Sequence, residues 1–295
     1  MFFGQTQKKT AEQLIGMALD EDLGLRGDVT TSALISEDET GSVQIVARSA
    51  GVLAGLPVAQ MVFDEVDRDI LFAPLGSDGE SLTAGQVVGE VSGSVRSLLV
   101  GERTCLNFLS HLSGIATLTH RYVEAVAGTR ARIYDTRKTL PGWRALQKYA
   151  VLAGGGCNHR LGLDDMVLIK DNHLAEWRAN ATDSSLAAAV GAARRWIDSR
   201  REGSLKIEVE VDTLDQFTDA LAGGPDIILL DNMTLDEMRQ AADLRNARAP
   251  HIELEASGGV SLSTVAAIAR TGVERISVGG LTHSAPALDL AFDWK

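Results

Sequence analysis

Apolar residues in the first part of the chain follow two different periods, which predicts a mixed α and β region. Residues 42–48 alternate apolar and polar side chains, as in a half-buried strand. Residues 86–95 favour a second strand interrupted by glycines. Residues 10–13 form a capping-box pattern before a helical repeat, and Pro57 suits the first turn of another helix. Residues 98–126 predict a long helix that Gly114 could divide.

The rest of the chain repeats one unit, a short β-branched run followed by helix-start residues. The six runs cover residues 132–134, 166–169, 207–209, 227–230, 252–255 and 276–278. Thr213–Gln216 and Thr234–Glu237 are capping-box patterns after two of these runs, and Ser261–Ser263 is a looser third copy. Repeated strand–turn–helix units indicate parallel strands with helical crossovers. Six of them predict a barrel or a barrel-like sheet.

Polar residues stand where each predicted strand ends. In parallel α/β folds the carboxyl ends of the strands share one edge, where functional groups gather. We therefore expect the following residues to converge: Asp135, Arg137, Lys138, Lys170, Glu210, Asp231, Ser257 and Gly279.

Charge is distributed unevenly. The chain has 28 Lys plus Arg against 40 Asp plus Glu, a formal net charge of -12. Between Ala131 and His173, however, basic residues outnumber acidic ones. A short cationic segment in an acidic protein favours a pocket for a small polyanion over a broad nucleic-acid surface.

Composition narrows the class of protein further. The aromatic content of 5% argues against base-stacking platforms for nucleic acid. No apolar run approaches the length of a membrane helix, and no signal-peptide pattern opens the chain. Two cysteines without such a signal suggest a reducing compartment. We therefore expect a cytoplasmic enzyme of 295 residues with no membrane partner.

Glycine pairs and carboxylates at late strand ends suggest how an anion would be held. Gly258–Gly259 and Gly279–Gly280 would let backbone amides approach a phosphate, and the Ser257 hydroxyl could add a donor. Glu210 and Asp231 could bind Mg²⁺, stabilise an oxocarbenium-like centre, or pair with Lys170 or Lys138.

Cationic side chains would form the other part of the site. They are Arg137, Lys138, His159, Arg160 and Lys170. Arginine forks pair with carboxylates through two hydrogen bonds, and each charge-assisted bond contributes roughly 1.5–3 kcal/mol. This set predicts a dicarboxylate ligand.

Ordered motifs along nearly the whole chain resemble one enzyme family. They are Glu21–Gly24, Gly27–Thr31, Gly51–Gly55, Glu102–Asn107, Asp135–Thr139, Asn158–Arg160, Leu168–His173, Glu208–Glu210, Leu230–Asn232 and Ser277–Gly279. The family is quinolinate phosphoribosyltransferase, also called carboxylating nicotinate-nucleotide pyrophosphorylase, a pentosyltransferase. The resemblance implies a type II phosphoribosyltransferase-like fold. This is an open α/β barrel of about six to seven strands (residues 114–281) plus an α/β sandwich domain (residues 1–113 and 282–295).

The resemblance also implies an activity. Members couple quinolinate to phosphoribosyl pyrophosphate with Mg²⁺, giving nicotinate mononucleotide, pyrophosphate and CO₂ in NAD biosynthesis. By matching motifs, quinolinate would be bound by Arg103, Arg137, His159, Arg160 and Lys170. The phosphoribosyl donor and its metal would be bound by Lys138, Glu210, Asp231, Ser257, Gly258 and Gly279. Lys138, Lys170, Glu210 and Asp231 would be catalytic. Arg103 would enter the site of a second subunit, so a homodimer or higher homo-oligomer is implied.

Two features depart from the family pattern, and other functions remain open. Gly259 stands where many relatives have Asn, and residues 177–180 suggest an unusual loop after the lysine motif. The alternatives are a homologous phosphoribosyltransferase acting on nicotinate or belonging to the molybdenum-transport-associated relatives, a Schiff-base aldolase using Lys170, and a noncatalytic binding protein.

Overall fold

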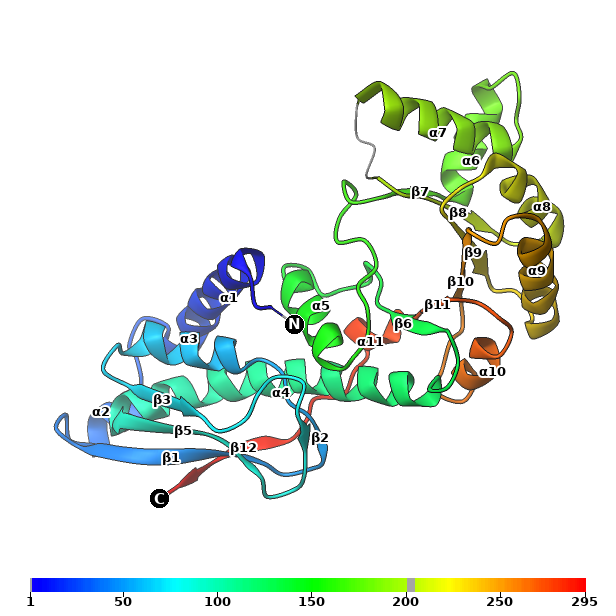
Figure 1. Ribbon diagram of the computed structural model, residues 1–295. Helices are drawn as coiled ribbons and strands as arrows, with labels where there is room; N and C mark the ends of the chain where they lie inside the picture. The colour runs from blue at the N-terminus through cyan, green and yellow to red at the C-terminus, as the bar shows by residue number, and fades with distance from the viewer. Residues whose placement is uncertain (1, 201–204) are drawn as a thin grey trace. The chain divides into compact units, whose positions relative to one another are not determined.

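The chain folds into two compact units in a computed structural model that describes residues 2–200 and 205–295. The first unit comprises residues 1–121, 138–156 and 280–295, and the second comprises residues 122–137 and 157–279. Figure 1 shows the elements of both units along the chain. Each unit has its own sheet, antiparallel in the first and parallel in the second.

The first unit is built from helices and a four-stranded antiparallel sheet of order β12-β1-β5-β3. Its helices are α1 (Gln5–Leu23), α2 (Val29–Leu34), α3 (Leu56–Val66), α4 (Val95–Ala125, as far as Arg121), α5 (Arg144–Ala153) and α11 (Gly280–His283). Its strands are β1 (Thr40–Ala47), β3 (Leu71–Pro74), β5 (Val87–Ser94) and β12 (Leu290–Trp294), with a separate pair β2 (Gly51–Val52) and β4 (Ser81–Leu82). The expected strands at 42–48 and 86–95 are thus confirmed.

An aromatic cluster holds α3 on this sheet. The fully buried Phe63 stacks on Phe72 of β3 and Phe292 of β12, with ring centroids 6.5 and 6.2 Å apart. Burying a side chain of this size contributes about 1.5–3 kcal/mol. The C-terminal strand is therefore fixed both by this packing and by its pairing with β1.

Two local expectations for the first unit are wrong. Helix α1 begins at Gln5, capped by Gly4 whose amide donates to the Gln7 side chain, so Thr10 lies inside the helix. Helix α4 continues through Gly114 without a break. Glycine at this position serves close packing and does not end the helix. A Cβ at Gly114 would lie 2.1 Å from the Pro286 carbonyl oxygen.

Residues 138–156 pack with the first unit, whereas we expected all of 114–281 in the barrel. Helix α5 is buried along most of its length. Its Tyr149 ring meets the Phe3 ring edge-on at 5.2 Å, and its hydroxyl donates to Asp78 at 2.6 Å. These partners lie far back in the sequence, so the local pattern could not reveal them.

The second unit is a six-stranded parallel sheet of order β6-β11-β10-β9-β8-β7 with helices along its length. Its strands are β6 (Arg132–Tyr134), β7 (Val167–Ile169), β8 (Ile207–Val211), β9 (Ile227–Asp231), β10 (Glu253–Ser257) and β11 (Arg275–Ser277). Its helices are α6 (Asp171–Asn180), α7 (Leu186–Arg200), α8 (Leu214–Gly223), α9 (Leu235–Arg248) and α10 (Val265–Ala269). The predicted α/β class, an open barrel with a separate α/β domain, is confirmed: one unit has a parallel six-stranded sheet and the other an antiparallel sheet with helices.

Helix entries in this unit agree only partly with the sequence pattern. The Thr213 and Thr234 hydroxyls accept the amides of Gln216 and Glu237, and the Thr234 box is complete. Helix α10 begins only at Val265, so Ser261 does not cap it. Residues 177–180 form the last turn of α6, not the loop that we expected.

Chain segments outside the sheet link its two ends. Cys157 forms a parallel bridge with Tyr134 of β6, and its amide donates to the Ile133 carbonyl at 2.8 Å. Three residues later, Arg160 Nη1 donates to the carbonyl of Met166, which directly precedes β7. Residues 157–166 therefore run between the two edge strands of the open barrel.

Candidate active site

The carboxyl ends of the parallel strands lie at one edge of the second unit, as predicted. Going across the sheet from β7 to β11, these ends carry Lys170, Glu210, Asp231, Ser257 and Gly279. Strand register places Asp231 opposite Ser257. Local patterns far apart in the sequence thus supply polar groups to a single rim, which we define as these five residues.

Lys170 and Glu210 form an ion pair on this rim. Pairing of Ile169 with Val209 sets the two side chains next to each other. Glu210 is largely buried at 14% side-chain exposure, whereas Lys170 remains 42% exposed. A half-exposed pair contributes little to stability, so an entering anion can compete for the ammonium group. The expected alternative of a salt bridge to Lys170 is thereby observed.

A strained turn links Asp231 to the β10 end. Asn232 has a positive φ of 54°, unusual for a residue other than glycine. Its amide N–H donates to the Ser257 carbonyl at 3.0 Å, and its side-chain Nδ2 donates to Asp231 Oδ2 at 2.7 Å. Gly258 leaves room for this side chain, since a Cβ there would lie 2.1 Å from Asn232 Oδ1.

We expect Gly258→Ala to destabilise the protein by about 1–3 kcal/mol, since both a left-handed φ of 89° and a collision oppose the methyl group. Gly259→Ala is the matched control, because its φ is also positive but a Cβ there meets nothing within 4 Å. Urea unfolding midpoints measure the difference. Equal losses in the two variants would show that the Asn232 contact is unimportant.

The loop after Cys157 is anchored beneath the rim. Asp135, which is fully buried, accepts the His159 N–H at 2.8 Å. His159 and Arg160 are each only 9% exposed, unlike the neighbouring Asn158. Backbone and side chain therefore hold this stretch in place at the end of β6.

Arg137 and Arg160 bring two guanidinium groups into this region. Burial and then the charge of Arg137 lower the pKa of Arg160. Within the described residues, the buried Nε of Arg137 has no hydrogen-bond partner. A buried donor without a partner costs about 1–3 kcal/mol. Two neighbouring cations, of which Arg137 has an unpartnered donor, favour an anionic ligand.

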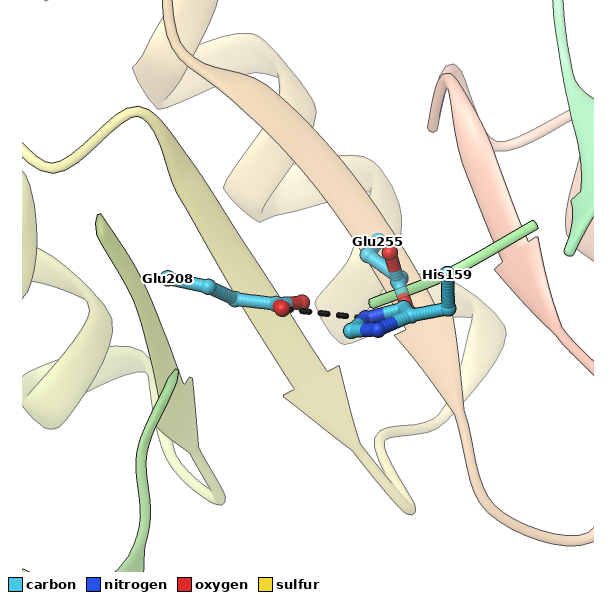
Figure 2. A group of neighbouring side chains, drawn as sticks. All are labelled: His159, Glu208 and Glu255. Atoms are coloured by element: carbon cyan, nitrogen blue, oxygen red, sulfur yellow. Dashed lines mark ion pairs between the residues drawn. The ribbon is translucent and has the colours of Figure 1, made fainter. Parts of the chain in front are cut away.

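Sequence reasoning assigned no role to a buried charged cluster in the barrel interior. His159 Nε2 lies 3.0 Å from Glu208 Oε2 and 3.3 Å from Glu255 Oε1. Figure 2 shows the His159 ring beside the two glutamate side chains. Both carboxylates are fully buried. Glu255 accepts two further hydrogen bonds, from Arg275 Nε at 2.5 Å and from the Ser277 hydroxyl. The Arg275 guanidinium also lies 3.8 Å from the centre of the Tyr134 ring.

Burial and charge act in opposite directions on this cluster. Burial alone would lower the pKa of His159, but hydrogen bonds and charges of Glu208 and Glu255 outweigh it and raise the pKa to about 9. Burial and then Glu255 raise the pKa of Glu208. The one signal in the sequence was Glu208 two residues before Glu210, which puts both on one face of β8.

Arg103 and Lys138 belong to the first unit. Arg103 is exposed on α4. Lys138 is also exposed, and its carbonyl accepts the Thr282 hydroxyl at 2.8 Å. The structure thus brings together the predicted residues of the second unit, whereas these two cations belong to the first.

Two family models match the chain. The quinolinate phosphoribosyl transferase N-terminal domain matches residues 28–113, and the C-terminal domain of that family matches residues 115–293. No described helix is long and apolar enough to cross a membrane.

Individual relatives match over nearly their full length. The nicotinate-nucleotide pyrophosphorylase [carboxylating] of Mycobacterium leprae is 46% identical over 287 residues, covering 96% of each chain. The mitochondrial quinolinate phosphoribosyltransferase [decarboxylating] 2b of Nicotiana tabacum is 38% identical, covering 95% of this chain and 81% of its own. The solved nicotinate-nucleotide pyrophosphorylase of Francisella tularensis has a TM-score of 0.88 at 36% identity, covering 97% of this chain and 96% of its own. NadC from Streptococcus pyogenes has a TM-score of 0.87 at 39% identity, covering 97% and 98%.

Proposed function

Because the chain belongs to the quinolinate phosphoribosyl transferase family, we propose that it transfers a phosphoribosyl group from phosphoribosyl pyrophosphate to quinolinate. The transfer is accompanied by decarboxylation and gives nicotinate mononucleotide, pyrophosphate and CO₂, a step in NAD biosynthesis. The observation that carries the proposal is the rim of the second unit, where Lys170 pairs with Glu210 beside Asp231 and Ser257. Positive and negative groups on one rim suit an acid acceptor and a sugar-phosphate donor.

Quinolinate carries two carboxylates, and the cationic residues provide partners for them. We assign Arg103, Arg137, Arg160 and Lys170 to direct contact with this acceptor, and His159 to the same site through its bond to the Arg160 amide. The buried Nε of Arg137 supports the assignment, since it has no partner within the described residues. The like charges of Arg137 and Arg160 also favour an anion. Burial and then the charge of Arg137 lower the pKa of Arg160, and a dicarboxylate would offset that repulsion.

Phosphoribosyl pyrophosphate would lie against the other strand ends. We assign Lys138, Glu210, Asp231, Ser257, Gly258 and Gly279 to this donor. The turn at Gly258 supports the assignment, since it has a positive φ of 89° and leaves no room for a side chain beside Asn232. Backbone amides exposed in such turns can approach phosphate oxygens closely.

Glu210 and Asp231 fit a magnesium site. They stand at the ends of the neighbouring strands β8 and β9 and offer the carboxylate oxygens that Mg²⁺ prefers. Bound with the donor, the ion would neutralise pyrophosphate charge. Their position supports a direct or water-mediated contact equally well.

The assigned residues then account for the chemistry. The pyridine nitrogen attacks the anomeric carbon as pyrophosphate departs, and Lys138 and Lys170 stabilise the departing charge. Glu210 and Asp231 stabilise the cationic sugar. The alkylated ring nitrogen is positive, so the 2-carboxylate can leave as CO₂ to give a carbanion beside that charge.

We expect Glu210→Ala to weaken the apparent affinity for Mg²⁺ in the reaction with the donor by about tenfold or more. The change removes one carboxylate ligand of the metal and leaves Lys170 without its ion-pair partner. Turnover measured against Mg²⁺ concentration at several donor concentrations gives the apparent affinity. Asp215→Ala, which removes an exposed carboxylate from the first turn of α8, is the control. An unchanged metal requirement in Glu210→Ala would rule out this ligand.

The proposed reaction is tested by release of labelled CO₂ from quinolinate carrying the label in its 2-carboxylate. Release should require both phosphoribosyl pyrophosphate and Mg²⁺, with nicotinate mononucleotide formed in equal amount. Nicotinate is run beside quinolinate as the competing acceptor. Product from nicotinate without CO₂ release from quinolinate would identify a different acceptor and refute the proposal.

The site also implies an assembly and a location. We propose a homodimer or higher homo-oligomer in which Arg103 enters the site of a second copy, as its exposure on α4 allows. We place the enzyme in the cytoplasm, with no nucleic-acid or membrane partner, because no described helix could cross a membrane and the chain is acidic.

A further inference from the structure

His159 has both ring nitrogens engaged inside the second unit. Nε2 lies between Glu208 and Glu255, at 3.0 and 3.3 Å (Figure 2). Nδ1 accepts the backbone N–H of Arg160 at 2.8 Å. The ring therefore links the barrel interior to the backbone of the next residue.

The bond at Nδ1 fixes the form of the ring. A backbone N–H can only donate, so Nδ1 must keep its lone pair. The ring hydrogen is then on Nε2, which lies 3.0 and 3.3 Å from oxygens of the two carboxylates. An imidazolium would place a hydrogen on Nδ1 against the Arg160 N–H, donor facing donor. Two observations conflict here: the carboxylates raise the pKa of His159 to about 9, which favours the charged ring, whereas the Arg160 N–H at Nδ1 opposes a second ring hydrogen. Because the backbone donor cannot turn away from Nδ1, we take the neutral ring as the form present at neutral pH.

The same bond argues against a metal ion among these three side chains. His159, Glu208 and Glu255 place one ligand atom each within 4.8 Å of one another. A metal at Nε2 would need the lone pair of that nitrogen and a hydrogen on Nδ1, which the Arg160 N–H opposes. Arg275, bonded to Glu255, adds a positive charge beside the cluster. The group is suited to hold a hydrogen and not a cation.

Of the two glutamates, Glu208 is the one whose only ion-pair partner within the described residues is His159. It is fully buried on β8, and within the described residues its oxygens have no hydrogen-bond partner of good geometry. The His159 Nε2 atom, 3.0 Å from Oε2, is the ion-pair partner of this carboxylate. Glu255 by contrast also binds Arg275 and Ser277. Burying a carboxylate costs free energy unless the charge is paired, so the contact between Glu208 and His159 calls for a function.

We propose that Glu208 and Glu255 are positioning residues that hold His159 as the Nε2–H tautomer, and that the ring so held places Arg160 for the substrate acid. The link is short: the ring accepts the Arg160 N–H, Asp135 accepts the His159 N–H, and the Arg160 guanidinium is tied to the Met166 carbonyl. The role of Arg160 toward quinolinate rests on the proposed function, whereas the tautomer does not.

The first test reads the tautomer directly in the whole enzyme. Nitrogen-15 NMR of protein labelled at histidine distinguishes protonated from unprotonated ring nitrogens, and the His159→Asn variant identifies the signals. At neutral pH, His159 should show an unprotonated Nδ1 and a protonated Nε2. Protonation of both nitrogens, or of Nδ1 alone, would overturn the proposal. This result stands even if the enzyme proves to use another acceptor.

The second test uses Glu208, whose ion-pair partner is His159. Glu208→Leu removes the acceptor and should lower kcat/KM for quinolinate by about 100-fold, as a displacement of about 1 Å can do. The KM for phosphoribosyl pyrophosphate should stay near its normal value. Glu208→Gln, whose amide oxygen still accepts from Nε2, should recover most of the loss and restore the wild-type nitrogen-15 pattern.

Glu253→Gln is the matched control, since Glu253 lies on the same face of β10 as Glu255 and also faces Arg275 at 3.5 Å, but does not contact the ring. Its kinetics should match the wild type. Equal losses in Glu208→Gln and Glu208→Leu, or equal rises in KM for both substrates, would show that the cluster is only structural. No turnover in the wild type with a normal NMR pattern would instead refute the proposed function alone.

Discussion

Replacing Lys170 with alanine is expected to lower kcat by about 10²- to 10³-fold, the usual cost of removing one group that stabilises developing charge. The variant should fold normally, because the Lys170 side chain is 42% exposed and its ion pair contributes little to stability. Steady-state rates with saturating quinolinate and donor, together with circular dichroism, measure both properties. A rate close to the wild type would contradict the assignment of Lys170.

Lys206→Ala is the matched control for this variant. Lys206 is an exposed lysine before β8, at the opposite end of the strands from the rim, and its contact with Glu253 is loose at 3.8 Å. Its loss should leave turnover unchanged.

Mixing Lys170→Ala with Arg103→Ala protein tests the shared site. An oligomer with Arg103 donated between copies would regain activity from two inactive variants. A mixture that stays inactive would argue against that donation.

Replacing Arg137 with alanine is the second large change. A bidentate contact with a carboxylate, at roughly 1.5–3 kcal/mol per charge-assisted bond, predicts a loss of about 100-fold or more in kcat/KM for quinolinate. The loss should appear mainly as a higher KM for the acid. Arg137→Lys should recover only part of it, because an ammonium group cannot reproduce the planar fork.

Arg132→Ala serves as the control for Arg137, because Arg132 is an exposed arginine at the other end of β6. Binding of quinolinate can also be followed by calorimetry without the donor. If Arg137→Ala binds the acid as tightly as the wild type, the unpartnered Nε has some other purpose.

The parts of the fold that could be predicted were those set by local pattern and a general rule. Lys170, Glu210 and Asp231 each follow or end a short apolar run, and parallel strands place such ends together. The Thr213 and Thr234 caps were predictable, since the partners of each lie within three residues. The roles of these residues came from family motifs and stay predictions until the variants are measured.

What the pattern missed depends on partners distant in the sequence. Glu208 and Glu255 come from separate strands and meet His159 from a loop between β6 and β7. Nothing in the few residues on either side of such a glutamate shows whether its side chain is buried or exposed to solvent. The same limit explains α5, whose Tyr149 finds Phe3 and Asp78 in the first unit.

The edge strand β12 has a consequence for how the protein is made. It pairs with β1, yet it leaves the ribosome only after every strand of the parallel sheet has been synthesised. Until then the edge of β1 that pairs with β12 is open, and the Pro286 segment that packs against Gly114 has not been synthesised. The unit translated first is therefore the last to be completed, and the nascent chain carries an unpaired β edge through most of its synthesis.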